Sequence, residues 1–325
     1  MNRIMITGGA GYIGCVLTSM LLKKGHQVFS LDNLKHSKLK YLRKFNKYKK
    51  FKFFKCDINN LSQTEKFIKN NKINTIVHLA GIVGDPASKL QKKLTKKTNL
   101  ESSKKIFFLC EKYNVKKFIF ASTCSNYGIV NSKKLADEKT RLKPLSLYAK
   151  TKVDFEKYLM KDSSIIQKII LRISTLYGFS HRMRFDLTVN EFIKKMYHKE
   201  KLEIYHKDTW RPYLSLEDLK LIVSKLINYP FKKNKIILNT GFNNENFSKK
   251  NIVDKIEKQL KFKPKYTYVE KAHFDKRNYR VDFTKLKKMK IKQRFSFEKN
   301  MKLIISYLNK INKRKSNYKV FYNHK

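Results

Sequence analysis

Cysteine is scarce in this chain, and no long apolar run occurs in it. The four cysteines are Cys15, Cys56, Cys110 and Cys124. None of them belongs to a C-x-x-C pair or to a Cys/His cluster with zinc spacing. We therefore expect reduced structural thiols and no metal site. No apolar run reaches the ~18 residues that a membrane span needs, so the sequence predicts no membrane segment.

The N-terminus also lacks the features of a secretory signal, because it begins as a strand. We therefore expect a cytoplasmic protein. No internal repeat and no linker rich in Pro, Gly or Ser divides the 325 residues. This length suits one large α/β domain, with or without a smaller lobe, and a hydrophobic content of 41% supports a folded core.

Acidic residues number only 25, against 75 Lys and Arg, so the formal net charge is +50. The lysines are spread along nearly the whole chain and are densest in residues 35–55 and 310–325. This spread indicates a compositional bias on solvated faces rather than a dedicated polyanion site, since charge acts on association more than on fold. We expect only nonspecific, salt-sensitive binding to nucleic acid.

What the chain does contain, in its first half, is an alternation of apolar strand-like runs with helical periodicity. Continuous apolar strands separated by helices predict a parallel sheet covered on both faces. Right-handed crossovers then give a doubly wound α/β fold of the Rossmann kind. The expected strands are Arg3–Ile6, Gln27–Leu31, Phe51–Lys55, Thr75–Leu79, Lys117–Ala121 and Ile166–Ile173. The expected helices are Gly11–Lys24, Lys38–Phe45, Ser62–Asn70, Lys89–Tyr113 and Leu147–Lys161.

The first expected strand runs directly into the segment TGGAGYIG. Gly8, Gly11 and Gly14 have the spacing of a dinucleotide-binding turn. They permit the tight turn, the approach of the backbone to a pyrophosphate, and close packing of helix on strand. The N–H groups at the start of the following helix, near Tyr12 and Ile13, would receive the phosphates. The segment therefore predicts a cofactor site.

Carboxylates end the next two strands. Asp32 ends the second strand, a little short of the usual offset of ~20 residues after the glycine turn. A carboxylate there accepts both hydroxyls of an adenosine ribose and repels a 2′-phosphate, which predicts NAD rather than NADP. Asn33 follows Asp32 at the same strand end. Asp57 and Ile58 end the third strand, where the carboxylate is placed to reach the adenine.

The fourth expected strand ends in His78, Leu79, Ala80 and Gly81. The small residues there let the backbone lie along the cofactor. We interpret His78 as a packed strand-end residue rather than a general base, because no partner lies near it in sequence.

The fifth strand ends in Thr123, and Tyr148 and Lys152 lie four residues apart in an expected helix, on one face. A hydroxyl at a strand end with a Tyr and a Lys one turn apart forms an acid–base device. A nearby ammonium and a positively charged nicotinamide favour the phenolate, so we expect the pKa of Tyr148 to be lowered. Tyr148 would take a proton from a substrate hydroxyl, Thr123 would hydrogen-bond that oxygen, and Lys152 would also hold the nicotinamide ribose.

Beyond residue 178 the pattern loosens. The expected helices there are Phe185–Lys199, Ser215–Asn228, Ser248–Leu260 and Phe297–Ile311, and the expected strands are Lys201–Tyr205 and Lys235–Asn239. We interpret residues 1–178 as an NAD-binding Rossmann domain. Residues 179–325 form a smaller substrate-binding lobe, interleaved with the sheet domain, and a basic C-terminal tail.

The motifs together resemble those of extended short-chain dehydrogenases/reductases, in the nucleotide-sugar epimerase/dehydratase group. They are, in order, TGGAGYIG, DNL, CDI, HLAG, a helical Asn99, STCSNYG, YAKTK and LRISTLYG. The resemblance covers nearly the whole chain. It implies that Thr123, Tyr148 and Lys152 are catalytic and that Asn99 belongs to the cofactor site. It also implies bound NAD, a nucleoside-diphosphate-sugar substrate and a homodimer formed through two sheet-flanking helices.

Three departures from the group's pattern bear on the reaction. Dehydratases of the group place Asp and Glu directly after the catalytic Thr, where this chain has Cys124 and Ser125, which disfavours a 4,6-dehydratase. Some epimerase–reductases carry a cysteine two residues before the motif tyrosine, whereas Cys124 lies three before Tyr127. We interpret Cys124 as a packed side chain, with an active thiol as the alternative. Many sugar epimerases have Asn after the L-R pair, where this chain has Ser174 and Thr175.

Arginines are the candidate substrate ligands, because a guanidinium grips a diphosphate with two parallel hydrogen bonds. Arg211 precedes an expected acidic helix start and is the first candidate. Arg182 and Arg184 are assigned to assist it, with ordinary surface charge as the alternative for these two.

The sequence therefore predicts an NAD-dependent epimerase that oxidises a nucleotide sugar transiently to a keto sugar. The first alternative is a net keto-sugar reductase or dehydrogenase, or a dehydratase, of nucleotide sugars. A second alternative, from the charge, is an RNA-binding protein built on the same fold. The intact glycine turn and Tyr/Lys pair disfavour that second alternative.

Overall fold

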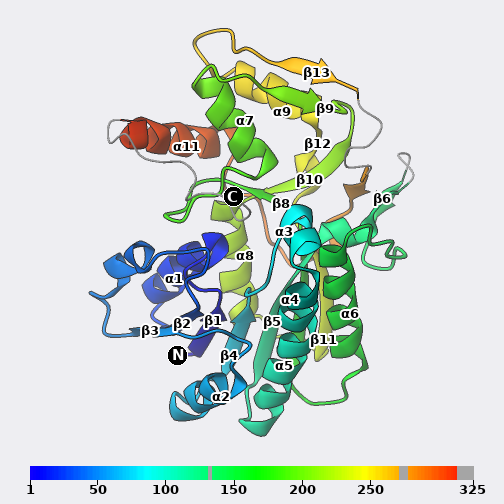
Figure 1. Cartoon of the computed structure of the whole chain (residues 1–325). Helices are drawn as coiled ribbons and strands as arrows, with labels where there is room; N and C mark the ends of the chain where they lie inside the picture. The colour runs from blue at the N-terminus through cyan, green and yellow to red at the C-terminus, as the bar shows by residue number, and fades with distance from the viewer. Residues whose placement is uncertain (131–133, 271–276, 313–325) are drawn as a thin grey trace.

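A seven-stranded parallel sheet forms the centre of the computed structural model, which describes residues 1–130, 134–270 and 277–312 (Figure 1). Its strand order is β11-β7-β5-β4-β1-β2-β3, so the chain starts in the middle and winds outward both ways. The strands are β1 (Arg3–Thr7), β2 (Gln27–Asp32), β3 (Phe51–Lys55), β4 (Thr75–His78), β5 (Lys117–Thr123), β7 (Gln167–Ile173) and β11 (Lys235–Thr240). The doubly wound α/β prediction is confirmed.

Helices cover both faces of this sheet (Figure 1). The central strands are buried on both sides: Ile4 and Ile6 belong to one apolar cluster, whereas Met5 between them belongs to the other. Side chains alternate across a strand, so this division places one cluster on each face. The first cluster includes α1 (Tyr12–Lys23) and α8 (Leu216–Asn228); the second includes α2 (Leu61–Asn70), α5 (Ser102–Lys112) and α6 (Leu147–Lys161).

Segments beyond residue 178 return to the sheet. β11 pairs with β7 in parallel register, and α8 packs against α1. The rest of the second half builds a lobe beyond the carboxyl ends of the strands (Figure 1). Its elements are β8 (Thr175–Tyr177), α7 (Thr188–Tyr197), β9 (Glu203–Tyr205), β10 (Trp210–Ser215), β12 (Asn246–Ser248), α9 (Lys249–Glu257), β13 (Thr267–Val269) and α11 (Phe297–Asn312). Shorter elements are β6 (Leu135–Ala136), η5 (Asn243–Glu245), β14 (Arg280–Val281) and α10 (Thr284–Lys288).

Two expected helices are wrong in form. Residues 38–45 form two 3-10 turns, η1 (Leu39–Tyr41) and η2 (Arg43–Phe45). The expected helix 89–113 is divided into α3 (Asp85–Leu90), α4 (Lys92–Lys96), a π-helical turn η3 (Lys97–Glu101) and α5. Gln91 breaks it, because its backbone lies at φ −119 and ψ 54, outside the helical region. The segment around Arg211 leads directly into the predicted acidic helix start, which is α8, and it forms a strand, β10, that was not predicted.

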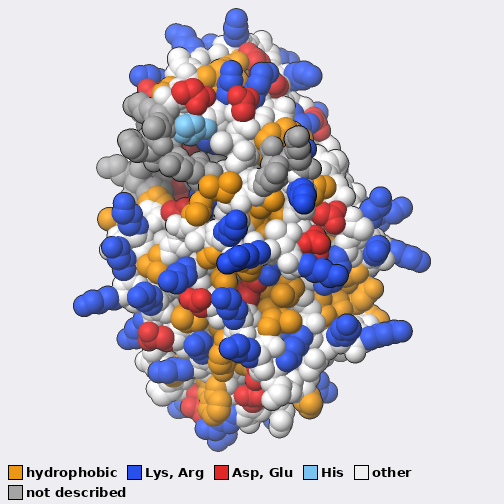
Figure 2. Space-filling model, turned by 90° about the vertical axis from the view of Figure 1, so that its right-hand side faces the viewer, with side chains coloured by type: hydrophobic (Ala, Val, Ile, Leu, Met, Phe, Trp, Pro, Cys, Tyr) orange, Lys and Arg blue, Asp and Glu red, His pale blue; other side chains and the backbone are white. Residues whose placement is uncertain are grey.

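Lysine and arginine side chains are scattered over the surface, with apolar side chains between them, on the face that Figure 2 presents. The densest basic run at the C-terminus lies mostly outside the described residues, which end at 312. Of the described helices, none combines the length and the apolar character needed to cross a membrane.

Candidate active site

A cavity of about 510 Å³ opens at the carboxyl ends of the sheet strands, under the lobe. In doubly wound folds ligands bind at this edge, where the strand order reverses. The predicted residues that line it are Gly8, Gly11, Tyr12, Ile13, Gly14, Asp32, Asn33, Asp57, Ile58, Leu79, Ala80, Gly81, Thr123, Tyr148, Lys152, Arg182, Arg184 and Arg211. The structure thus brings together all the predicted site residues except Asn99.

The glycine turn forms one end of the cavity. Gly8 has φ +70, a backbone conformation that favours glycine, and its N–H donates to the Leu31 carbonyl at 2.8 Å. Gly14 lies so close to the turn that a Cβ would stand 2.5 Å from the Gly8 carbonyl oxygen. Gly11 precedes α1 without a side-chain cap, so the first N–H groups of the helix remain available. An anion of the cofactor's phosphate type fits this end.

The carboxylates at the ends of β2 and β3 are held in place by amides. Asp32 is buried, and its two oxygens accept from the Ala10 N–H at 3.1 Å and the Leu34 N–H at 2.8 Å. Burial raises the pKa of Asp32, and these hydrogen bonds act in the opposite direction. Asp57 accepts from the Asn33 side chain at 2.9 Å and from Asn59 at 2.8 Å. A carboxylate has about four acceptor positions, so both groups retain capacity for a ligand.

Asn99 is placed differently from the prediction. Its carboxamide accepts from the Ile82 N–H at 2.8 Å and donates to the Ile82 carbonyl at 2.9 Å. A Cβ on Gly81 would lie 2.9 Å from Asn99 Oδ1, so only glycine fits between them. Asn99 is absent from the described residues that line the cavity. From the π-helical turn η3, it therefore holds the loop after β4 in shape.

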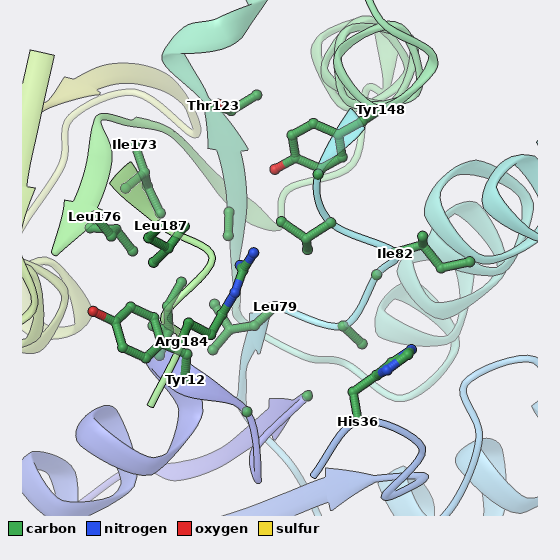
Figure 3. A pocket seen from close by; sticks show the side chains of 18 of the residues that line it. Tyr12, His36, Leu79, Ile82, Thr123, Tyr148, Ile173, Leu176, Arg184 and Leu187 are labelled. Atoms are coloured by element: carbon green, nitrogen blue, oxygen red, sulfur yellow. The ribbon is translucent and has the colours of Figure 1, made fainter. Parts of the chain in front are cut away.

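Tyr148 and Thr123 face the cavity from α6 and the end of β5 (Figure 3). Burial raises the pKa of Tyr148 to about 12, and the charge of Arg184 and a hydrogen bond with Thr123 act in the opposite direction. The expected lowering of this pKa is therefore wrong for the protein by itself, because desolvation of the phenolate outweighs the neighbouring charges.

Lys152 lies one turn after Tyr148 and is almost fully buried. Its Nζ donates to the Ala121 carbonyl at 2.9 Å and lies 5.8 Å from the centre of the Tyr148 ring. Burial lowers the pKa of Lys152 to about 8, whereas the negative charge of Glu156 raises it. The ammonium is thus the main form at neutral pH, close to its titration range.

His78 is a packed residue, as predicted. It is fully buried, its Nδ1 lies 2.8 Å from Thr7 Oγ1, and its Nε2 lies 2.9 Å from Ser103 Oγ. Burial lowers the pKa of His78 to about 3, so the ring is neutral. The imidazole is neutral and both of its nitrogens have a hydroxyl partner, so His78 contributes to the packing of the sheet and not to the reaction.

Cys124 is packed as well. Its thiol is buried and donates to the Arg172 carbonyl at 3.1 Å. Burial raises the pKa of Cys124 to about 12, which keeps the nucleophilic thiolate unpopulated at neutral pH.

We expect Cys124→Ser to leave turnover unchanged and native protein to resist thiol alkylation, measured by kinetics and intact mass. Rapid loss of activity on alkylation of Cys124 would restore the active-thiol alternative.

The three arginines occupy different parts of the cavity. The Arg182 guanidinium is buried and donates to the His36 carbonyl at 2.8 and 3.0 Å, so it braces the loop after β2. Arg184 pairs with Asp186 through two contacts, at 2.6 and 3.1 Å, and points toward the Tyr148 end (Figure 3). Arg211 lies over the Tyr279 ring, 5.1 Å from its centre. Arg211 also donates to two backbone carbonyls, those of Trp210 and Arg277. Such contacts therefore do not decide which arginine grips the diphosphate, and the predicted roles of Arg182 and Arg211 stay predictions.

The cavity lining also includes residues that the predicted site left out, among them Ser125, Asp85 and Arg277. Ser125 Oγ lies 2.8 Å from Thr123 Oγ1, which places a second hydroxyl beside the predicted catalytic residues. Asp85, the first residue of α3, forms an ion pair at 2.9 Å with Arg277 of the lobe, and both line the cavity. Ser125 was detectable from its place two residues after Thr123. The Asp85–Arg277 pair was not, because its members are far apart in sequence.

Comparison with known proteins agrees with this geometry. The NAD dependent epimerase/dehydratase family matches residues 4–241. A UDP-glucuronate 4-epimerase of Thermodesulfobacterium geofontis is 27% identical over 300 residues, which cover 89% of this chain and 90% of that protein. Protein CapI of Staphylococcus aureus is 29% identical over 244 residues, 72% of this chain and 71% of that protein.

Solved structures show the same fold. The UDP-glucose 4-epimerase of Thermotoga maritima, solved with UDP-glucose, has a TM-score of 0.85 at 24% identity and covers 96% of this chain and 100% of its own. The UDP-glucose 4-epimerase of Thermus thermophilus, solved with NAD, has a TM-score of 0.83 at 23% identity, over 94% and 99% of the two chains. From the match over residues 4–241 and the assembled cavity, the chain belongs to the NAD dependent epimerase/dehydratase family of enzymes.

Proposed function

We propose that this protein is an NAD-dependent UDP-sugar 4-epimerase. The observation that carries the proposal is one cavity that joins the glycine turn to the Thr123, Tyr148 and Lys152 side chains. The 4-epimerase names of its relatives support the choice of reaction and of the UDP moiety. A dinucleotide and a sugar bound end to end would meet in front of Tyr148.

The residues present fit NAD. The glycine turn and the uncapped start of α1 suit the pyrophosphate, and Asp32 is a buried carboxylate with acceptor capacity for ribose hydroxyls. A 2′-phosphate would face the Asp32 charge, so we propose NAD rather than NADP. When bound, NAD accepts a hydride from the sugar and returns it.

The chain's own groups manage the proton. Tyr148 takes the proton of the sugar hydroxyl as that carbon loses its hydride, and Thr123 hydrogen-bonds the same oxygen. The Lys152 ammonium stabilises the phenolate form that Tyr148 needs to accept this proton, because an opposite charge nearby favours the ionised form. On return of the hydride to the other face of the keto sugar, Tyr148 gives the proton back. The keto sugar must turn within the cavity between the two steps.

The three arginines receive proposed roles from their places. Arg211, on β10 of the lobe, is proposed to grip the diphosphate. Arg184 acts electrostatically on Tyr148, so we propose that it lies at the sugar rather than the diphosphate. Arg182 is proposed to position the loop after β2 for the adenosine half of NAD.

Incubation with NAD and a panel of nucleotide sugars tests this proposal. The panel holds UDP-glucose, UDP-glucuronate and UDP-N-acetylglucosamine, with dTDP-, GDP- and CDP-sugars as controls for the base. We expect a product of unchanged mass with an altered ring coupling at C4 for at least one UDP-sugar, by mass spectrometry and proton NMR. We also expect no net NADH absorbance. Loss of one water, or steady accumulation of NADH, would instead identify a dehydratase or a net oxidoreductase.

The alternatives are weaker on structural grounds. A dehydratase of the resembled kind would need an acid at the Cys124 position, and that thiol is buried and weakly acidic. An RNA-binding role would leave the cavity and its Tyr/Lys pair without purpose. Nonspecific binding of nucleic acid through the basic surface stays a prediction.

We also propose a homodimer formed through the outer faces of α5 and α6. The apolar side chain that supports it is Phe108, which is 58% exposed on α5.

A cytoplasmic location is proposed on the four cysteines, which are all free and buried, as suits a reducing compartment.

A further inference from the structure

A buried ion pair lies directly behind the catalytic residues. Glu156 is one helical turn beyond Lys152 on α6, and Arg172 lies on β7. Both are almost fully buried, and Arg172 donates to Glu156 through Nη2 at 2.8 Å and Nε at 3.1 Å. Both contacts go to Oε2, and Nε also donates to Oε1 at 3.3 Å, so the guanidinium fixes the orientation of the carboxylate as well as its distance.

Glu156 also holds the turn that carries Thr123. Its Oε1 accepts from the Ser122 hydroxyl and from the Asn126 side chain, the latter at 2.9 Å. Ser122 is the neighbour of Thr123 at the end of β5, and Asn126 lies in the 3-10 turn η4 (Cys124–Tyr127) that follows. One carboxylate thus connects the strand end of Thr123 to the helix of Tyr148 and Lys152.

The network continues across the sheet. Arg172 Nη1 donates to the Tyr127 hydroxyl at 3.1 Å and to the Glu138 carbonyl at 3.1 Å. The Tyr127 hydroxyl donates to Asn239 Oδ1 on β11 at 2.6 Å. Residues of β5, α6, β7 and β11 therefore share one set of hydrogen bonds, which a displacement of α6 would break.

Stability alone does not account for this arrangement. Desolvating two charges costs several kcal/mol, and apolar residues of similar volume often replace a buried pair without loss of stability. What apolar residues would not provide is directional contact with Ser122 and Asn126, or a negative charge near Lys152.

We propose, resting on the catalytic set assigned above, that Glu156 is a positioning residue: it fixes the Thr123 strand end against α6 and places a negative charge one helical turn from Lys152. Arg172 compensates the Glu156 charge and orients the carboxylate. The roles are separable, because one depends on hydrogen-bond geometry and the other on charge.

The groups around Lys152 make the charge effect specific. On α6, the Tyr148 ring lies near Lys152 Nζ and the Glu156 charge acts on it. On β5, the Phe120 ring lies near Nζ and the Ala121 carbonyl accepts from it. From β4 it meets His78, whose ring is neutral. Within residues 1–130, 134–270 and 277–312, Glu156 is the one group whose charge raises the pKa of Lys152 against the effect of burial. Without that charge, the ammonium should lose its proton at a lower pH.

Glu156→Gln tests the charge. We expect the alkaline limb of kcat/KM to move down by about one pH unit, the size of effect typical of a neighbouring opposite charge. NAD affinity should also fall at high pH, and the pH at which it falls should move down in the same way. It is measured by titration calorimetry from pH 6 to 9 (about the range that brackets the pKa of Lys152). Asp154→Asn is the matched control: it removes a carboxylate from the same helix, two residues from Lys152, and should leave both limbs in place.

Arg172→Lys tests the geometry, since it keeps both charges and loses the forked contact. We expect kcat to fall about ten- to a hundredfold from misplacement of the Thr123 strand end, with the alkaline limb unmoved. If Glu156→Gln fails to fold, because it leaves Arg172 unpaired, Glu156→Gln/Arg172→Gln removes both charges and is measured instead.

The outcomes decide the proposal. A folded Glu156 variant with wild-type kcat and wild-type alkaline limbs would overturn it, as would an equal shift in Asp154→Asn. The NAD titration does not depend on sugar turnover. If the protein epimerises no sugar, the proposed function is wrong, but the pH dependence of NAD affinity still decides the role of Glu156.

Discussion

Tyr148→Phe is expected to lower kcat about 10²- to 10⁴-fold, the contribution typical of a positioned proton-transfer group. The change removes one oxygen atom and keeps the ring that packs beside Lys152. NAD affinity should persist, because the glycine turn and the carboxylates of β2 and β3 lie at the other end of the cavity. Loss in kcat with retained NAD binding, measured by product NMR and calorimetry, would assign proton transfer to the phenol.

Tyr158→Phe provides the matched control on the same helix. Tyr158 is a half-buried ring that stacks on Phe155, at 5.9 Å between centroids, away from the cavity. Removing its hydroxyl should leave turnover unchanged. Equal turnover of Tyr148→Phe and the wild type on every accepted sugar would remove Tyr148 from the mechanism.

Because the pKa of Tyr148 is raised, its role as a proton acceptor depends on the charge of Lys152. A phenol with a pKa of about 12 is protonated at neutral pH and suited to donate to a keto oxygen. To accept a proton in the first step, its phenolate needs stabilisation by the Lys152 ammonium. Because the Lys152 ammonium is lost as pH rises through about 8, turnover should decline above that pH, and this decline is the limb that the Glu156 variants move.

Gly14→Ala should abolish most NAD binding, with a loss in affinity of at least about tenfold. The new Cβ would stand 2.5 Å from the Gly8 carbonyl oxygen and 2.6 Å from Gly9 Cα, and both are backbone atoms of the turn itself. A clash with backbone cannot be relieved by a rotamer, so the turn must open and move its N–H groups away from the pyrophosphate. Calorimetric titration with NAD measures the effect.

Gly25→Ala separates this local effect from general destabilisation. Gly25 has φ +80 with nothing within 4 Å of its Cβ position, and it is absent from the cavity lining among the described residues. Alanine there should lower the melting temperature through backbone strain alone and leave NAD affinity intact. Wild-type NAD affinity in Gly14→Ala would show that the turn does not contact the cofactor.

Much of the cofactor site could be predicted from the sequence, because its determinants are local. The spacing of Gly8, Gly11 and Gly14 between a strand and a helix can be recognised within the first fourteen residues. Asp32 can be recognised because it ends an apolar run. Tyr148 and Lys152 share a helical face by their spacing alone. In each case, neighbouring backbone geometry determines where the side chain points.

The tertiary structure decided the rest, because burial and long-range contacts have no local signal. Asn99 turned out to hold Ile82, seventeen positions away, and Arg182 to hold the carbonyl of His36. The pKa of Tyr148 is raised rather than lowered because remote segments exclude water from it. The Glu156–Arg172 pair forms because the sheet places β7 beside β5, within reach of the side chains of α6. Sequence determined which residues could do the chemistry; packing determined their partners, their protonation and which of them reach the cavity.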